Sequence, residues 1–149
     1  MSLDDRKWHQ AVVGDPRQLS GSSTEEFLRG LIETSGSRWI CIRDLDGAYS
    51  GLRGAEGRSL RASEFLNRVS HAVQYNWAFF FLYRKEPSIS VVGSNDRENI
   101  SRADVTVRLV DDQYFYVYTT DDRVYDYLVE SYPDLEHKTA DLHNLDIPN

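Results

Sequence analysis

The apolar and aromatic run at residues 77–84 places the strongest constraint on how this chain can fold. Such a run is typical of a central strand that is covered on both of its faces. Residues 88–93 predict another strand, and only the three residues 85–87 separate it from the first. A parallel crossover needs roughly a dozen residues or more. We therefore expect the two strands to be antiparallel neighbours, which is incompatible with an all-parallel sheet.

Further elements follow from the spacing of the apolar residues. Residues 38–43 predict a strand, and residues 103–121 predict a second hairpin with its turn at residues 111–113. Apolar residues at helical spacing predict three helices, over residues 22–36, 62–75 and 120–133.

This order of elements predicts an α+β fold, with a mostly antiparallel sheet of about five strands and three helices packed mainly on one face. We expect a single α+β domain over residues 1–149, because neither a linker nor an internal repeat divides the chain. The N-terminal stretch is polar and is interrupted by Gly14, Pro16 and Gly21. A loosely ordered N-terminal arm is therefore expected over residues 1–22.

Composition indicates a cytoplasmic protein. The N-terminus lacks an apolar run behind a basic start, as a secretory signal would have. No segment approaches the roughly 20 apolar residues that a membrane span requires. The single cysteine, Cys41, cannot form an internal disulfide and lies in a predicted strand, where a buried and inert thiol is expected. The four histidines do not have metal-ligand spacing, and no cofactor motif is present, so we expect neither a metal nor a cofactor.

The stretch Asp44-Leu45-Asp46-Gly47, directly after a strand, resembles the nucleophile motif of the haloacid-dehalogenase-like phosphatases. In that family the first aspartate attacks phosphorus, and the second handles the proton of the leaving group. The flanking residues Arg43 and Ala48 depart from the family pattern. The resemblance also implies a doubly wound parallel sheet, which the predicted hairpins exclude. We therefore interpret Asp46-Gly47 as a turn after the strand.

The loop at residues 51–61 is a candidate anion-binding site. Its glycines give a flexible backbone, and Arg53, Arg58 and Arg61 lead into the start of a predicted helix. Backbone N–H groups and arginines at such a position favour an anion. The alternative is a solvated connection. If the anion site is present, the protein would be an enzyme or a binding protein for a small anionic ligand.

The predicted second hairpin carries an acidic and tyrosine-rich stretch. Residues 104–149 contain 3 Lys/Arg against 11 Asp/Glu, whereas residues 1–103 contain 14 against 13. Alternation places three tyrosines on one face of the last strand, with aspartates before and after them. The candidate partner-binding residues are Asp111, Asp112, Tyr114, Tyr116, Tyr118, Asp121 and Asp122. The alternative is that a helix covers the tyrosines and makes them part of the core.

The preferred functional hypothesis is a non-catalytic interaction protein that binds a basic protein partner through this tyrosine and aspartate surface. Tyrosine is enriched at interfaces because it combines a large contact area with a hydroxyl that tolerates water. An inhibitor or immunity-type protein that blocks a nuclease is one concrete form. The acidic field repels nucleic acid, so a nucleic-acid partner is not expected. The second hypothesis is the anionic-ligand site at the arginine loop.

Overall fold

The computed structural model describes residues 6–14, 21–48, 52, 54–69, 74–87, 95–111 and 113–148. The strands are β1 (Trp8–Gly14), β2 (Trp39–Ala48), β3 (Ser59–Arg61), β4 (Gln74–Tyr83), β5 (Val105–Val110), β6 (Tyr114–Thr119) and β7 (Glu136–Ala140). The helices are α1 (Gly21–Ser35), α2 (Ala62–Val69), α3 (Asp96–Arg102) and α4 (Asp122–Ser131), with a short 3-10 helix η2 (Leu142–Asn144).

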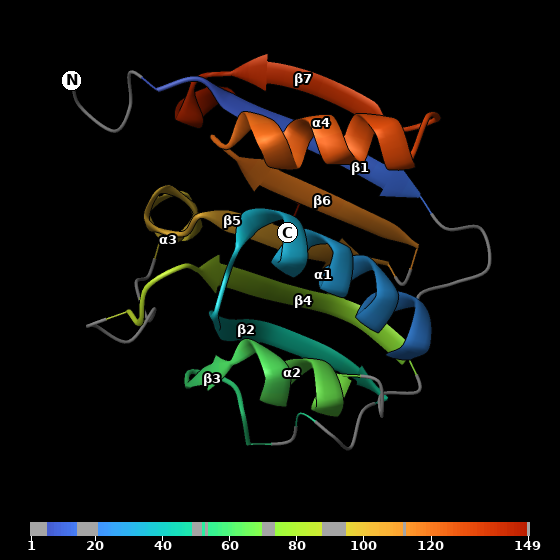
Figure 1. Ribbon diagram of the computed structural model, residues 1–149, viewed down its shortest axis with the longest axis vertical. Helices are drawn as coiled ribbons and strands as arrows, with labels where there is room; N and C mark the ends of the chain where they lie inside the picture. Colours follow the sequence, from blue (N-terminus) through green and yellow to red (C-terminus); the bar gives the residue numbers. More distant parts are fainter. Residues whose placement is uncertain are drawn as a thin grey trace.

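All seven strands belong to one antiparallel sheet, in the order β3-β2-β4-β5-β6-β1-β7 (Figure 1). The predicted α+β class and the antiparallel sheet are confirmed. The expected five strands and three helices are only roughly right, because the described residues form seven strands and four α-helices. None of the described helices is both long enough and apolar enough to cross a membrane.

The sheet separates two hydrophobic cores, and we name its two faces by what covers them. On the helix face, α1, α2 and α4 contribute Leu28, Phe65 and Leu128 to the larger core (Figure 1). On the second face, α3 contributes Ile100 and η2 contributes Leu142 to a smaller core. Three helices thus cover one face, as predicted, while α3 and the segment after β7 cover part of the other.

The run at residues 77–84 is the central strand that its composition predicts. Alternation along β4 sends Phe80 and Leu82 into the core of the helix face and Phe79 and Phe81 into the core of the second face. The predicted hairpin partner at residues 88–93 lies outside the described residues. Both edges of β4 are paired, with β2 and β5, so the expected pairing of β4 with the next segment is wrong. Strands from distant parts of the chain occupy the two positions beside it.

The N-terminal segment is the largest departure from the prediction. Residues 8–14 are part of the expected loose arm, but they form β1, an interior strand that pairs with both β6 and β7. Trp8, Ala11 and Val13 are buried. The strand pattern is hard to recognise in the sequence because the segment contains the polar residues His9 and Gln10 and ends at Gly14. The strand is stable in the fold because β6 and β7 supply hydrogen bonds on both of its edges.

Two further boundaries differ from the prediction. The stretch 44–47 is not a turn, because β2 continues to Ala48 through register shifts after Arg43 and Asp46, with Asp44 at a positive φ of 52°. Such irregularities let a strand continue while one residue adopts a turn-like conformation. The second helix ends at Val69, and β4 begins at Gln74. The helix predicted up to residue 75 is therefore too long, because residues 74 and 75 belong to β4.

Candidate functional site

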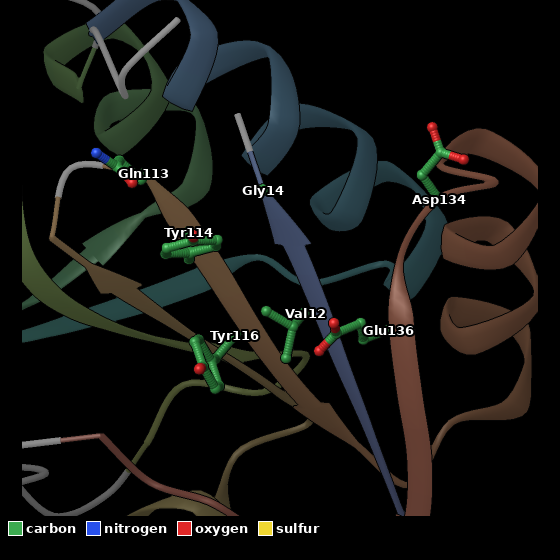
Figure 2. A pocket seen from close by; sticks show the side chains of 7 residues that line it. All are labelled: Val12, Gly14, Gln113, Tyr114, Tyr116, Asp134 and Glu136. Carbon is green, nitrogen blue, oxygen red and sulfur yellow. The ribbon is translucent and has the colours of Figure 1, made fainter. Parts of the chain in front are cut away.

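An open cavity of about 700 Å³ lies on the second face, near the edge of the sheet formed by β7 (Figure 2). The described lining residues come from β1, β6 and the turn before it, the start of β7 and the segment that leads from α4 into β7. They are Val12, Gly14, Gln113, Tyr114, Tyr116, Asp134 and Glu136. We call this cavity the tyrosine pocket.

The strand register explains why a cavity forms on this part of the sheet surface. In one row across the sheet Tyr116 of β6 pairs with Val12 of β1, which pairs with Glu136 of β7. In the next row Tyr114 pairs with Gly14. The middle strand therefore contributes only small side chains, between tyrosines on one side and an acid on the other. Val12 and Gly14 on β1 form the floor of the pocket, and the larger side chains on β6 and β7 form its walls.

The ring of Tyr114 forms one wall and is the most exposed aromatic side chain among the large hydrophobic residues described, at 42%. It lies close to the backbone of Gly14: a Cβ atom at position 14 would be 3.2 Å from Cε1 of Tyr114. The glycine thus leaves space for the ring beside β1. The exposed ring thus offers an aromatic face and a hydroxyl beside the cavity.

The electrostatic environment of the tyrosine pocket is negative. Partial burial raises the pKa of Tyr116, and the charges of Asp146 and Glu136 and the neighbouring Tyr114 raise it further. Asp134 and Glu136 are exposed, and within the residues that the structure describes neither carboxylate has an ion pair or a hydrogen bond. Among the described residues of the lining, none is a lysine or an arginine. The pocket therefore offers carboxylate acceptors whose charge no other described residue neutralises.

Tyr114, Tyr116 and Tyr118 lie on one face of β6 and form the predicted tyrosine stripe. The third of them has a different environment. Tyr118 is fully buried, and its hydroxyl donates a hydrogen bond of 2.6 Å to the carbonyl oxygen of Asp146. Burial raises the pKa of Tyr118 well above its ordinary value. No helix from the helix face covers the stripe. Instead, the segment after β7 covers its Tyr118 end and leaves the Tyr114 end open.

The structure distributes the predicted aspartates over both ends of β6. Asp111 is exposed in the turn before β6, whereas Asp112 lies outside the described residues. Asp121 and Asp122 lie beyond the other end of β6, at the start of α4. Asp121 caps this helix and is paired with Arg84 and Arg123, and Asp122 is 2.7 Å from Nε2 of His9. Asp121 and Asp122 are thus held in contacts that secure α4, away from the open end of the stripe.

The predicted anion-binding arginines are only partly described. Arg53 lies outside the described residues. Arg58 is exposed in the turn before β3, and Arg61 is exposed at the end of β3, where its guanidinium lies 5.2 Å from the ring centre of Trp39. The anion site at this loop stays a prediction.

Sequence reasoning missed the acidic residues that line the tyrosine pocket. Asp134 and Glu136 are in a tail that lacks clear periodicity, and Val12 and Gly14 are in the segment that was expected to be loosely ordered. Their proximity to Tyr114 depends on the pairing of β1 with both β6 and β7. The general excess of acidic residues after residue 104 was the only available signal.

A buried arginine on the second face was also missed. Arg108 is only 5% exposed, and its guanidinium lies 4.1 Å and 4.9 Å from the ring centres of Phe79 and Trp77. Its Nη1 is 3.8 Å from Asp44, and neither Nε nor Nη1 forms a hydrogen bond. Burial lowers the pKa of Arg108, while the nearby Asp44 opposes this shift. A charged residue within the apolar strand sequence VTVRLV was the signal for this position.

Comparisons with known proteins do not identify a relative: no family model, curated protein or solved structure matches the chain significantly. Within the described ranges, no group of three or more His, Cys, Asp or Glu side chains is placed to hold a metal ion.

Proposed function

We propose that this protein is a non-catalytic interaction module that binds a basic partner protein through the tyrosine pocket and the acidic surface around it. The observation that carries the proposal is the combination, in one cavity, of the rings of Tyr114 and Tyr116 with the carboxylates of Asp134 and Glu136, which form no ion pair with another described residue. Desolvated aromatic anchors supply much of the affinity of protein interfaces, and unpaired charges select a partner of opposite charge.

The distribution of charge over the molecule supports the same proposal. The acidic segment 104–149 supplies β5, β6, α4 and β7, which lie together in one half of the sheet (Figure 1). Most of the negative charge therefore lies on the side of the molecule that carries the tyrosine pocket. Such a field accelerates association with a basic protein and makes it sensitive to salt. An inhibitor of the immunity type, which blocks a basic substrate groove, is the form of this function that we favour.

Affinity capture with matched variants tests the proposal. The immobilised wild-type protein is exposed to lysate of the native host at low salt, and bound proteins are released by high salt and identified. We expect one stoichiometric basic partner. The double variant Tyr114→Ala/Glu136→Gln should bind that purified partner at least about tenfold more weakly, which corresponds to about 1.4 kcal/mol.

The matched control removes the same kinds of group from α4. Val129 is the other exposed large hydrophobic residue in the described chain, at 39%, and Glu130 is exposed beside it. The variant Val129→Ala/Glu130→Gln changes the net charge by the same amount and should bind like wild type. Equal binding by both double variants, whether retained or lost, would contradict the proposal.

A further inference from the structure

The geometry of the tyrosine pocket indicates which group of the partner enters it, an inference that rests on the proposed function. The tyrosine wall on β6 and the acid on β7 are separated by β1. Since neighbouring strands lie about 4.8 Å apart, the backbones of the two strands that carry the walls are about 10 Å apart. Val12 and Gly14 keep the floor low between them. The space is thus wide enough for one extended side chain that contacts aromatic rings on one side and a carboxylate on the other.

The charges around the pocket select a cation. Asp134 and Glu136 have no ion pair or hydrogen bond within the described chain. The nearest lysine along β7, Lys138, is engaged elsewhere: its Nζ is 3.0 Å from a carboxylate oxygen of Asp146 and donates a hydrogen bond of 2.7 Å to the carbonyl oxygen of Asn144. The chain therefore does not neutralise the acidic wall with this lysine. A neutral side chain could donate hydrogen bonds but would leave the charge of both carboxylates uncompensated, and an anionic side chain would be repelled.

The distribution of acceptors distinguishes between the two common cations. The pocket presents two carboxylates on one wall, and the phenol oxygens of Tyr114 and Tyr116 on the other wall form no hydrogen bond within the described residues. A guanidinium is planar, stacks on aromatic faces and carries five N–H donors that point in several directions. A lysine ammonium is compact and more strongly hydrated, so it can donate hydrogen bonds to the acceptors on only one wall of such a pocket. We propose that the tyrosine pocket receives an arginine side chain of the partner protein.

Nuclear magnetic resonance titration of the isotope-labelled full-length chain tests this assignment. The probes are three capped tripeptides, Ac-Gly-Xaa-Gly-NH₂, in which Xaa is arginine, lysine or citrulline, a neutral analogue with nearly the shape of arginine. We expect saturable shifts for the backbone amides of Tyr114, Tyr116 and Glu136 with the arginine peptide. Its affinity should exceed that of the lysine peptide by about fivefold or more, and citrulline should not saturate.

Two variants separate stacking from charge. Tyr114→Leu retains an apolar wall but removes the aromatic face, so the preference for arginine over lysine should disappear. Glu136→Gln retains the shape but removes a charge, so binding of both cationic peptides should weaken. Equal or tighter binding of lysine by the wild-type protein, equal binding of citrulline, or saturable shifts confined to residues outside the pocket would each overturn the arginine assignment.

The outcomes also distinguish this inference from the proposed function. If the captured partner depends on Tyr114 and Glu136 but the arginine peptide shows no preference, the interaction module stands and the arginine assignment fails. If the arginine peptide binds in the pocket but no partner depends on these residues, the assignment stands and the proposed partner-binding function fails.

Discussion

At the scale of the residue, three tyrosines of one alternating pattern have different environments. Tyr118 is buried and hydrogen-bonded to the backbone of Asp146, Tyr116 is half-buried, and Tyr114 is exposed. The alternation explains why all three lie on the second face. Their exposure differs because the segment after β7 covers only one end of β6. The proposed contact surface is therefore the open end of the stripe, which includes Tyr114.

Arg108 gives a residue-scale prediction about stability. Its guanidinium is buried with two nitrogen atoms, Nε and Nη1, that lack hydrogen bonds, and Asp44 is too distant to form one. An unsatisfied buried donor costs about 1–3 kcal/mol, whereas cation–π contacts with Trp77 and Phe79 return about 0.5–2 kcal/mol each. Replacement of a buried charge by an apolar residue of similar size is often neutral or stabilising.

We expect Arg108→Met to retain or increase the free energy of unfolding, by up to about 2 kcal/mol. Arg108→Ala should lower it by about 2 kcal/mol or more, because it removes the packing against the two rings. Urea denaturation of both variants measures these changes. A large loss of stability in Arg108→Met would show that the charge itself, and not the packing of the side chain, stabilises the second face.

At the scale of the element, α1 and α4 approach each other closely over the sheet. Gly30 lies within α1, and a Cβ atom at this position would be 2.0 Å from the hydroxyl oxygen and 2.9 Å from Cζ of Tyr127 on α4. The missing side chain of Gly30 thus provides the space for the end of the tyrosine. Glycine within a helix costs about 0.5–1 kcal/mol relative to alanine, and the contact between the two helices offsets this cost.

This contact predicts that the effect of Gly30→Ala on stability changes sign when Tyr127 is also replaced. Gly30→Ala alone should lower the free energy of unfolding by about 1–3 kcal/mol, because Tyr127 must move from its place. In a Tyr127→Ala background the same substitution should raise stability by up to about 1 kcal/mol, since only the gain in helix propensity remains. A double-mutant cycle measured by chemical denaturation tests this expectation. Additive effects would contradict the close contact.

At the scale of the whole molecule, the N-terminal strand β1 is inserted between two strands from the C-terminal part of the chain. It pairs with β6 through six residue pairs and with β7 through five. The pocket exists only because β1 lies between these strands and contributes its floor. The acidic half of the sheet is therefore a composite of the first strand and the last three.

An interior position for β1 predicts that proline is not tolerated there. Ala11 is 1% exposed and pairs with both Val117 and His137. Ala11→Pro removes a ladder hydrogen bond from an interior strand, and we expect a loss on the order of 3 kcal/mol. Lys7→Pro, just before the strand, is the control. It removes only an exposed ion pair with Asp141 and should cost at most about 1 kcal/mol. Thermal denaturation measures both, and a tolerated Ala11→Pro would contradict the placement of β1.

The sequence by itself determined the features that depend on neighbouring residues. Alternation of apolar residues predicted the hairpin of β5 and β6, its turn near Asp111 and the position of the three tyrosines on one common face. Apolar residues at helical spacing predicted a helix over residues 120–133, and α4 occupies most of this range, with Asp121 as its N-cap. These signals are local because strand alternation and helix capping act within a few residues.

Only the tertiary structure decided the order of the strands and the composition of the pocket. The partners of β4, the insertion of β1 between β6 and β7, and the meeting of Gly14, Tyr114 and Glu136 all join segments that are distant in the chain. Pairing between distant strands leaves no local pattern, because each strand is compatible with several neighbours. The choice among them depends on the burial and hydrogen bonding of the complete sheet.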